Sequence, residues 1–106
     1  MFLAGNATYH NDSNRITDVT SQPGGASWVG ALSMSGNVWN WTSSIASPYP
    51  YNATDGRENP NDGGSQRVMR GGSYTDDSEV LMTTTRGFIG PAAENPNVGF
   101  RCARSF

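Results

Sequence analysis

The sequence is poor in several residue types that common functional sites require. It has one cysteine, one histidine and no lysine, so all seven of its basic residues are arginines. Because Cys102 is the single cysteine, an internal disulfide and a multi-cysteine zinc site are both excluded. His10 stands among polar residues with no second imidazole to form a metal-binding pair, so we expect a solvated or capping side chain.

Charge and hydropathy exclude further classes of protein. The formal net charge is −2, whereas nucleic-acid-binding domains normally carry a basic excess on one face, so we expect no nucleic-acid partner. No apolar stretch is long enough to span a bilayer, and the start, MFLAGNATYH, lacks a charged leader followed by an apolar run. We therefore expect no membrane association, while the cellular compartment stays open.

Glycine, proline and small polar residues make up much of what is present. Thirteen glycines and six prolines, with many asparagines, serines and threonines, leave little room for long helices. At 106 residues the chain forms one domain at most, with one modest core. We therefore predict several short strands joined by long ordered loops.

Two stretches are typical of the central strands of such a fold. In RVMRGGSY, residues 67–74, two glycines follow an apolar pair, which predicts either φ > 0 or a close approach of another segment. In GNVWNWT, residues 36–42, Trp39 and Trp41 are two positions apart and would share one face of a strand. We expect both stretches to be short strands whose aromatic faces are buried against each other.

The rest of the chain supplies further core candidates. Residues 80–88 run from apolar residues into threonines of high β preference. In residues 97–106, the alternation of Val98, Phe100 and Cys102 predicts a closing strand with Cys102 buried as a small hydrophobic residue; the alternative is a reactive thiol. The first half of the core is predicted from Trp28, Val29, Ala31, Leu32, Met34, Val38, Trp39 and Trp41.

Residues 43–66 form a long loop between the two central stretches. The prolines of SPYPY favour extended backbone, and NATDGRENPNDGGS is a string of turn residues. A loop of this length in a compact domain is usually functional or tied down. We expect Arg70, Arg86 and Arg101 to hold such loops in place; the alternative is that they line a groove for an acidic peptide or ligand.

Five motifs together resemble the C-terminal half of the formylglycine-generating-enzyme (sulfatase-modifying factor) domain. They are GNVWNWTSS, PYPY followed by DGRE, RVMRGGSY, an R-G-F element and a terminal N-x-GFRCAR, in that order. The motif core spans residues 28–104 of a single partial or minimal domain, residues 1–106. The resemblance implies an α+β, C-type-lectin-like fold with mostly antiparallel strands.

The resemblance also implies a chemistry, which this sequence does not support. Enzymes of the family oxidise a substrate cysteine to formylglycine with oxygen and copper held by two cysteine thiolates. Those positions fall at about Asp76 and Leu81, neither of which is a useful Cu(I) ligand, so we expect no copper and no such oxidation. Iron-dependent sulfoxide synthases of the family carry their metal histidines in a separate preceding domain, and with His10 alone we expect that chemistry to be absent too.

The resemblance assigns a ligand groove containing Ser73, which we expect to act as a hydrogen-bonding group because no histidine is placed to activate it. Asp76, Asp77 and Glu79 form an acidic cluster nearby, either solvated or available as acid and base. The predicted ligand-binding residues are Trp41, Ser73, Tyr74, Asp76 and Arg86.

The resemblance also implies a structural calcium site in the GNVWNW segment. The corresponding ligands are Asn37, Val38 and Asn40, where neutral Asn40 replaces an acidic residue and should lower the affinity. The alternative is that Asn37 and Asn40 hydrogen-bond to neighbouring loop backbone.

Three functions stay open. The first is a module that binds a peptide or small-molecule ligand, built on a non-catalytic or degenerate member of the family. The second is a formylglycine-generating oxidoreductase whose remaining part lies outside this chain. The third is a lectin-like variable receptor of a diversity-generating system, displaying polar residues such as Asn52, Asp76 and Asp77 on loops. We also expect self-association as a homo-oligomer, because a half-domain with much apolar aromatic surface needs a cover.

Overall fold

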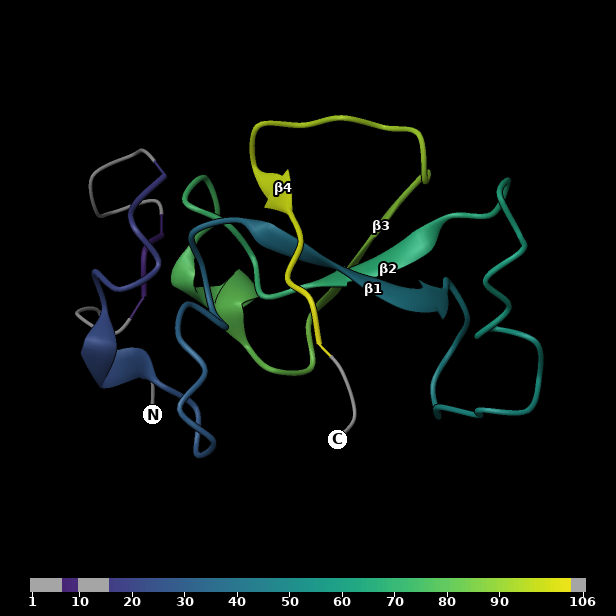
Figure 1. The fold of residues 1–106 in the computed structure, drawn as a ribbon, viewed down its shortest axis with the longest axis horizontal. Coiled ribbons are helices and arrows are strands. Elements are labelled where there is room, and N and C mark those ends of the chain that lie inside the picture. Colours follow the sequence, from purple (N-terminus) through teal and green to yellow (C-terminus); the bar gives the residue numbers. More distant parts are fainter. Residues whose placement is uncertain (1–6, 10–15, 104–106) are drawn as a thin grey trace.

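The computed structural model describes residues 7–9 and 16–103 of the chain. Within these residues the fold is built on one four-stranded sheet, with long loops at both ends and two short 3₁₀ helices. Figure 1 shows the loop after the first strand (teal) extending from one end of the sheet, while the segment before that strand (blue) lies at the other end. The prediction of short strands, long loops and little helix is confirmed.

The sheet has the strand order β3-β2-β1-β4, which Figure 1 shows at the centre of the molecule. β2 is antiparallel to both β1 and β3, whereas β4 is parallel to β1. The two stretches predicted to be central strands are therefore strands, but they pair edge to edge in one sheet. The described elements are η2 (Pro23–Gly25), β1 (Trp39–Ile45), β2 (Arg67–Arg70), η3 (Ser78–Leu81), β3 (Arg86–Ile89) and β4 (Val98–Gly99).

Alternation along the strands gives the sheet two different faces. On one face, a Cβ added to Gly87 would lie 2.6 Å from the Met69 Cε and 3.5 Å from the indole of Trp39, so these three residues are packed together. Trp41, which pairs with Met69, is on this face too. The opposite face carries Thr42, Val68, Arg70, Arg86 and Phe88.

Gly71 and Gly72 end β2 in the manner that their sequence predicts. Their φ angles are +102° and +69°, in the region that residues with a Cβ rarely adopt. A Cβ on Gly71 would lie 2.8 Å from the Met34 carbonyl oxygen, and one on Gly72 would lie 2.6 Å from the Leu81 Cδ2. Both the positive φ angle and the close packing therefore favour glycine at these two positions.

The core is smaller than the sequence predicts. Trp28 is 96% exposed, Val29 66% and Met34 46%, so the prediction that these residues belong to the core is wrong. Residues 27–31 form a turn closed by backbone hydrogen bonds, which leaves Trp28 and Val29 exposed at its tip. The buried apolar residues of the described chain are Ala7, Trp39, Val68, Leu81 and Ile89.

The closing strand is also shorter than predicted. β4 pairs with Trp39 and Asn40, and the described residues that follow, 100–103, belong to no strand, so the alternation stops there. Phe100 is 76% exposed and Cys102 is exposed, so the prediction of a buried Cys102 is wrong.

The threonine run lies before its strand and not within it. Residues 78–81 form η3, the Thr85 N–H donates to the Met82 carbonyl in a turn (3.0 Å), and β3 begins only at Arg86. His10 lies outside the described residues. Across residues 7–9 and 16–103, the structure contains no helix of the length and apolarity that crossing a membrane requires.

Candidate ligand-binding site

The five residues predicted to bind ligand lie in three different places. Ser73, Tyr74 and Asp76 are in one turn directly after β2. Trp41 is on the packed face of the sheet with Met69. Arg86 is on the opposite face, where its side chain lines a pocket beside the long loop. The structure therefore brings three of these residues together and separates Trp41 and Arg86 from them.

The Ser73 turn is closed on itself. Ser73 is 0% exposed, its Oγ donates to Asp76 Oδ2 (2.9 Å) and lies 2.9 Å from Thr75 Oγ1, and its N–H also donates to Asp76 (2.8 Å). The Tyr74 N–H donates to the Asn37 carbonyl (2.8 Å). The bonds of the Ser73 hydroxyl lie within its own turn, and its role as a ligand-binding group stays a prediction.

The implied calcium ligands are hydrogen-bonded within the protein. Asn37 is buried with φ +66°, its Oδ1 accepts from the Thr17 N–H (2.9 Å), and its Nδ2 donates to the Thr17 carbonyl (3.0 Å). Asn40 Nδ2 donates to the Val38 carbonyl (3.2 Å). An ion bound through Asn37 Oδ1 would therefore share that oxygen with the Thr17 N–H. The described residues also include no group of three His, Cys, Asp or Glu side chains arranged to hold a metal.

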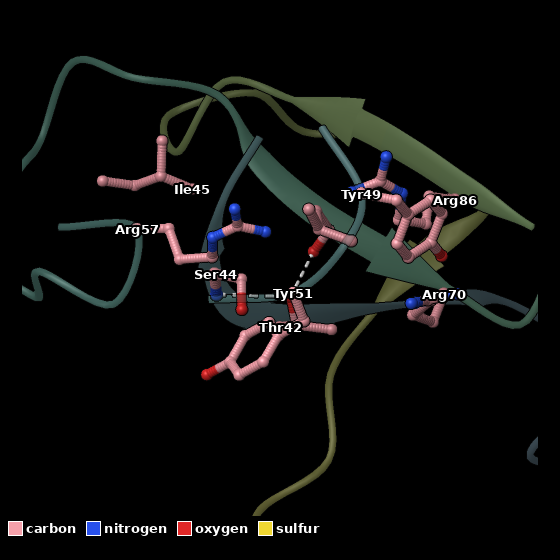
Figure 2. Close-up of a pocket in the computed structure, with 9 residues that line it drawn as sticks. Thr42, Ser44, Ile45, Tyr49, Tyr51, Arg57, Arg70 and Arg86 are labelled. Carbon is pink, nitrogen blue, oxygen red and sulfur yellow. Dashed lines mark hydrogen bonds between the residues drawn. The ribbon is translucent and has the colours of Figure 1, made fainter. Parts of the chain in front are cut away.

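A pocket of about 250 Å³ opens between the loop after β1 and the face of the sheet that carries Arg70 and Arg86. Figure 2 shows side chains from both reaching into it, with arginines on either side. Its lining combines guanidinium groups, phenol rings, hydroxyls and two aliphatic side chains. The lining residues are Thr42, Ser44, Ile45, Tyr49, Tyr51, Arg57, Val68, Arg70 and Arg86.

Arg57 fixes the loop wall of this pocket. Its side chain is 6% exposed, and its Nη2 lies 2.7 Å from the Asp55 Oδ2 in an ion pair. The same nitrogen donates to the carbonyls of Pro48 (3.3 Å) and Pro50 (3.5 Å), while the guanidinium lies 5.4 Å from the centre of the Tyr51 ring. Hydrogen bonds from Arg57 hold the pKa of Asp55 below its ordinary value.

Glu58 joins the loop to β1. Its carboxylate accepts hydrogen bonds from the hydroxyls of Ser43 (2.7 Å), Ser44 and Tyr51 (3.2 Å). The bonds from Ser44 and then Ser43 lower the pKa of Glu58, whereas burial and the neighbouring Glu58 raise the pKa of Tyr51. The wall is therefore anchored by charged hydrogen bonds at two points, Arg57 and Glu58.

Arg67 anchors the far part of the loop. It is 9% exposed, and its guanidinium donates to the carbonyls of Ser43 (2.6 Å), Asn59 (2.8 Å) and Asp62 (2.7 Å). The hydrogen-bond partners of this buried guanidinium are therefore backbone carbonyl oxygens, and none of them is a carboxylate.

The sheet wall of the pocket presents two arginines, one from each of two paired strands. Arg70 lies directly opposite Arg86 in the β2–β3 ladder. The Arg86 guanidinium carbon is 3.8 Å from the centre of the Tyr49 ring, and that of Arg70 is 5.9 Å from it. Figure 2 shows the Tyr49 ring beside Arg86, with Arg70 below them. One aromatic ring therefore contacts both cations.

The motif arginines also hold loops, as the sequence predicts. Arg70 Nη1 donates to the carbonyls of Thr83 (3.0 Å) and Thr85 (3.3 Å), and Arg86 Nη1 donates to that of Ser47 (2.6 Å). Arg101 Nη2 likewise donates to the Ser33 carbonyl (3.0 Å).

Sequence reasoning did not identify Tyr49, Tyr51 or Arg57 as site residues. Their motifs, PYPY and DGRE, predict an ordered loop, but neither motif predicts that the loop folds back over the sheet. The paired spacing of Tyr49 and Tyr51 was the available signal, because two exposed phenols beside prolines form a semi-rigid aromatic surface.

Comparison with known proteins places this geometry in a family. A family model described as "Sulfatase-modifying factor enzyme 1-like domain" matches residues 2–106. Hercynine oxygenase of Mycobacterium tuberculosis is 35% identical over 84% of this chain, and inactive C-alpha-formylglycine-generating enzyme 2 of Mus musculus is 33% identical over 72%. The chain spans 22% of the length of each of these two relatives.

A solved structure supports the same placement at the level of the fold. Treponema denticola variable protein 1 aligns with a TM-score of 0.73 and 24% identity, covering 91% of this chain and 34% of that one. The predicted α+β, C-type-lectin-like fold is therefore confirmed. With a family model matching nearly its whole length, the chain belongs to the formylglycine-generating-enzyme (sulfatase-modifying factor) family.

Proposed function

We propose that this chain is a non-catalytic or degenerate member of its family that binds a peptide or small-molecule ligand in the pocket between the sheet and the loop. The single observation that carries the proposal is a pocket of about 250 Å³ whose two walls are held in place by buried or charged hydrogen bonds. Walls that are already ordered lose little freedom when a ligand binds, so more of the contact energy appears as affinity.

The state of the Ser73 turn favours binding over the family's oxidation. The positions of the family's thiolates fall at about Asp76 and Leu81; Asp76 accepts two hydrogen bonds from Ser73, and Leu81 is buried. Carboxylate and alkyl groups do not hold Cu(I) as thiolates do. One relative of the chain is itself named as an inactive formylglycine-generating enzyme.

The proposal is tested by nuclear magnetic resonance on the whole chain. A panel of neutral, acidic and basic small molecules and tripeptides is titrated into ¹⁵N-labelled protein, and amide shifts are followed to millimolar concentration. We expect at least one compound to shift the amides of Thr42, Tyr51 and Arg57 together. If every compound leaves those amides unmoved, the pocket is not a ligand site and the proposal is wrong.

Two other functions have their own tests. Incubation with copper, oxygen and a cysteine-bearing sulfatase peptide would yield an aldehyde if the chain were a formylglycine-generating oxidoreductase, and we expect none. A variable receptor would show hypervariable positions among sibling sequences at exposed loop residues such as Asn52 and Asp77. Cysteines after RGGS in those siblings would instead support the oxidoreductase.

A further inference from the structure

We propose that Arg70 and Arg86 together bind an oxyanion, the carboxylate or phosphate group of a small ligand with an aliphatic body. This inference rests on the proposed ligand-binding function and names the chemical class of the ligand. It starts from the cross-strand register, which places the two arginines directly opposite each other. Like charges in such a pair repel, and a negative group bound between them would offset that repulsion.

No carboxylate of the described residues supplies that negative charge. The one ion pair found within residues 7–9 and 16–103 joins Arg57 to Asp55, and Glu58 is held by three hydroxyl groups. Arg70 and Arg86 make their hydrogen bonds to backbone carbonyls instead. A carbonyl satisfies an N–H group but carries no net charge, so two positive charges stay uncompensated in this part of the chain.

The two guanidinium groups are anchored at one end and open at the other. Both use Nη1 for carbonyls, while Nη2 and Nε make no hydrogen bond to the described residues. A guanidinium has five donors in a rigid plane, and its free edge matches two oxygens of a carboxylate or phosphate. Two such edges from adjacent strands would offer an oxyanion up to four charge-assisted hydrogen bonds.

Tyr49 orders both cations before a ligand arrives. Its ring is contacted by both guanidinium groups, and its hydroxyl donates to the Thr84 carbonyl (3.1 Å), which fixes the ring against the turn before β3. Stacking removes rotamers that a free arginine would populate and lowers the entropy lost on binding.

The remaining lining sets the size and character of the ligand. Ile45 and Val68 supply aliphatic surface, and the hydroxyls of Thr42 and Ser44 are already used, since they donate to the Val68 carbonyl and to Glu58. A volume of about 250 Å³ suits a molecule smaller than a typical drug. A short aliphatic acid, or an aliphatic phosphate of similar size, fits these features.

The test uses three small probes on the full chain at low ionic strength. They are succinate, inorganic phosphate and the neutral diamide succinamide, each followed by amide shifts at the pocket. We expect succinate or phosphate to bind at least tenfold more tightly than succinamide, and the tighter of the two identifies the type of oxyanion.

Matched variants separate the specific site from general attraction to positive charge. Arg70→Gln and Arg86→Gln should each weaken binding of the preferred anion at least tenfold. Arg101→Gln removes the same charge at an exposed position bonded to Ser33, and it should change the affinity less than twofold. Arg86→Lys keeps the charge without the planar fork and should give an intermediate loss. Thermal melting of each variant shows whether it is folded.

Each remaining outcome decides between the inference and the function it rests on. If succinamide binds as tightly as succinate, or if Arg101→Gln weakens binding as much as Arg86→Gln, the oxyanion inference is wrong while a ligand site in the pocket stands. If no probe and no member of the panel of neutral, acidic and basic compounds shifts the pocket amides, both the inference and the proposed function are wrong.

Discussion

Arg70 and Arg86 are opposed across the β2–β3 ladder, and the guanidinium of each lies over the ring of Tyr49 from the long loop. Opposed like charges in a sheet are unfavourable by roughly 0.2–1 kcal/mol, and contact with an aromatic face returns a similar amount. The loop therefore does more than connect β1 to β2, because its aromatic ring makes the arginine pair tolerable and forms the wall of a pocket.

Replacing the glycines that end β2 should destabilise the fold. Gly71→Ala introduces a Cβ at φ +102° and 2.8 Å from the Met34 carbonyl oxygen, so we expect a loss of roughly 2–4 kcal/mol in the free energy of unfolding. Gly63→Ala is the matched control, because its φ is ordinary and a Cβ there meets nothing within 4 Å. Urea denaturation measures both; equal stabilities would contradict the packing described for Gly71.

Removing Arg67 should loosen the far part of the long loop. Arg67→Gln shortens a buried side chain and takes the donor from three carbonyls, which should lower the free energy of unfolding by roughly 2–4 kcal/mol. Arg101→Gln removes one exposed hydrogen bond and should stay within about 0.5 kcal/mol of the parent. A result in which both variants match the parent would mean that Arg67 does not anchor the loop.

The contribution of Glu58 to stability should depend on pH. Its pKa is lowered in the folded protein by the Ser44 and Ser43 hydroxyls, so its stabilising effect is full above the unfolded value of about 4.3 and is lost as the pH falls through the folded value. We expect Glu58→Gln to melt at a lower temperature than the parent at pH 7, with the difference shrinking at pH 2.5.

The control for this experiment is Glu94→Gln. Glu94 is exposed and has no hydrogen bond to the described residues, so its replacement should leave the melting temperature unchanged at both pH values. A Glu58→Gln difference that is the same at pH 7 and pH 2.5 would contradict the role given to the carboxylate.

Calcium binding at Asn37, Val38 and Asn40 stays a prediction. An ion that binds only the folded state must raise the melting temperature, by the equivalent of about 2.7 kcal/mol at one hundred times its dissociation constant. Asn40→Asp adds the negative charge that the family's segment carries, so it should enlarge the calcium-dependent shift, while magnesium serves as the control ion. No shift for either protein at millimolar calcium would remove the site.

Self-association also stays a prediction. Trp28 is 96% exposed and Phe100 76% exposed, and large apolar groups in that position favour contact with another protein surface. We expect light scattering to detect dimers at high concentration and Trp28→Ser to reduce them without lowering the melting temperature. A parent protein that is monomeric at every concentration would contradict this expectation.

The sequence by itself determined the family, the two central strands and the glycines that end β2. These features depend on short-range rules: β-favouring residues next to each other, and glycine where a Cβ has no room. The order of the five motifs along the chain indicated the family, and the family model that matches residues 2–106 gives the same family. The loop-holding roles of Arg70, Arg86 and Arg101 were predictable for the same reason, because a covered guanidinium must find oxygen atoms nearby.

Only the tertiary structure decided which residues meet. Trp28 and Trp39 look alike in sequence, but one lies at the tip of a turn and the other is packed against Met69 and Gly87, because burial depends on what lies opposite. Cys102 is exposed because the chain leaves the sheet after Gly99 although β1 continues to Ile45, which no alternation in the last strand could reveal. The pocket itself requires the strand register and the return of the loop, both set by long-range contacts that local patterns do not contain.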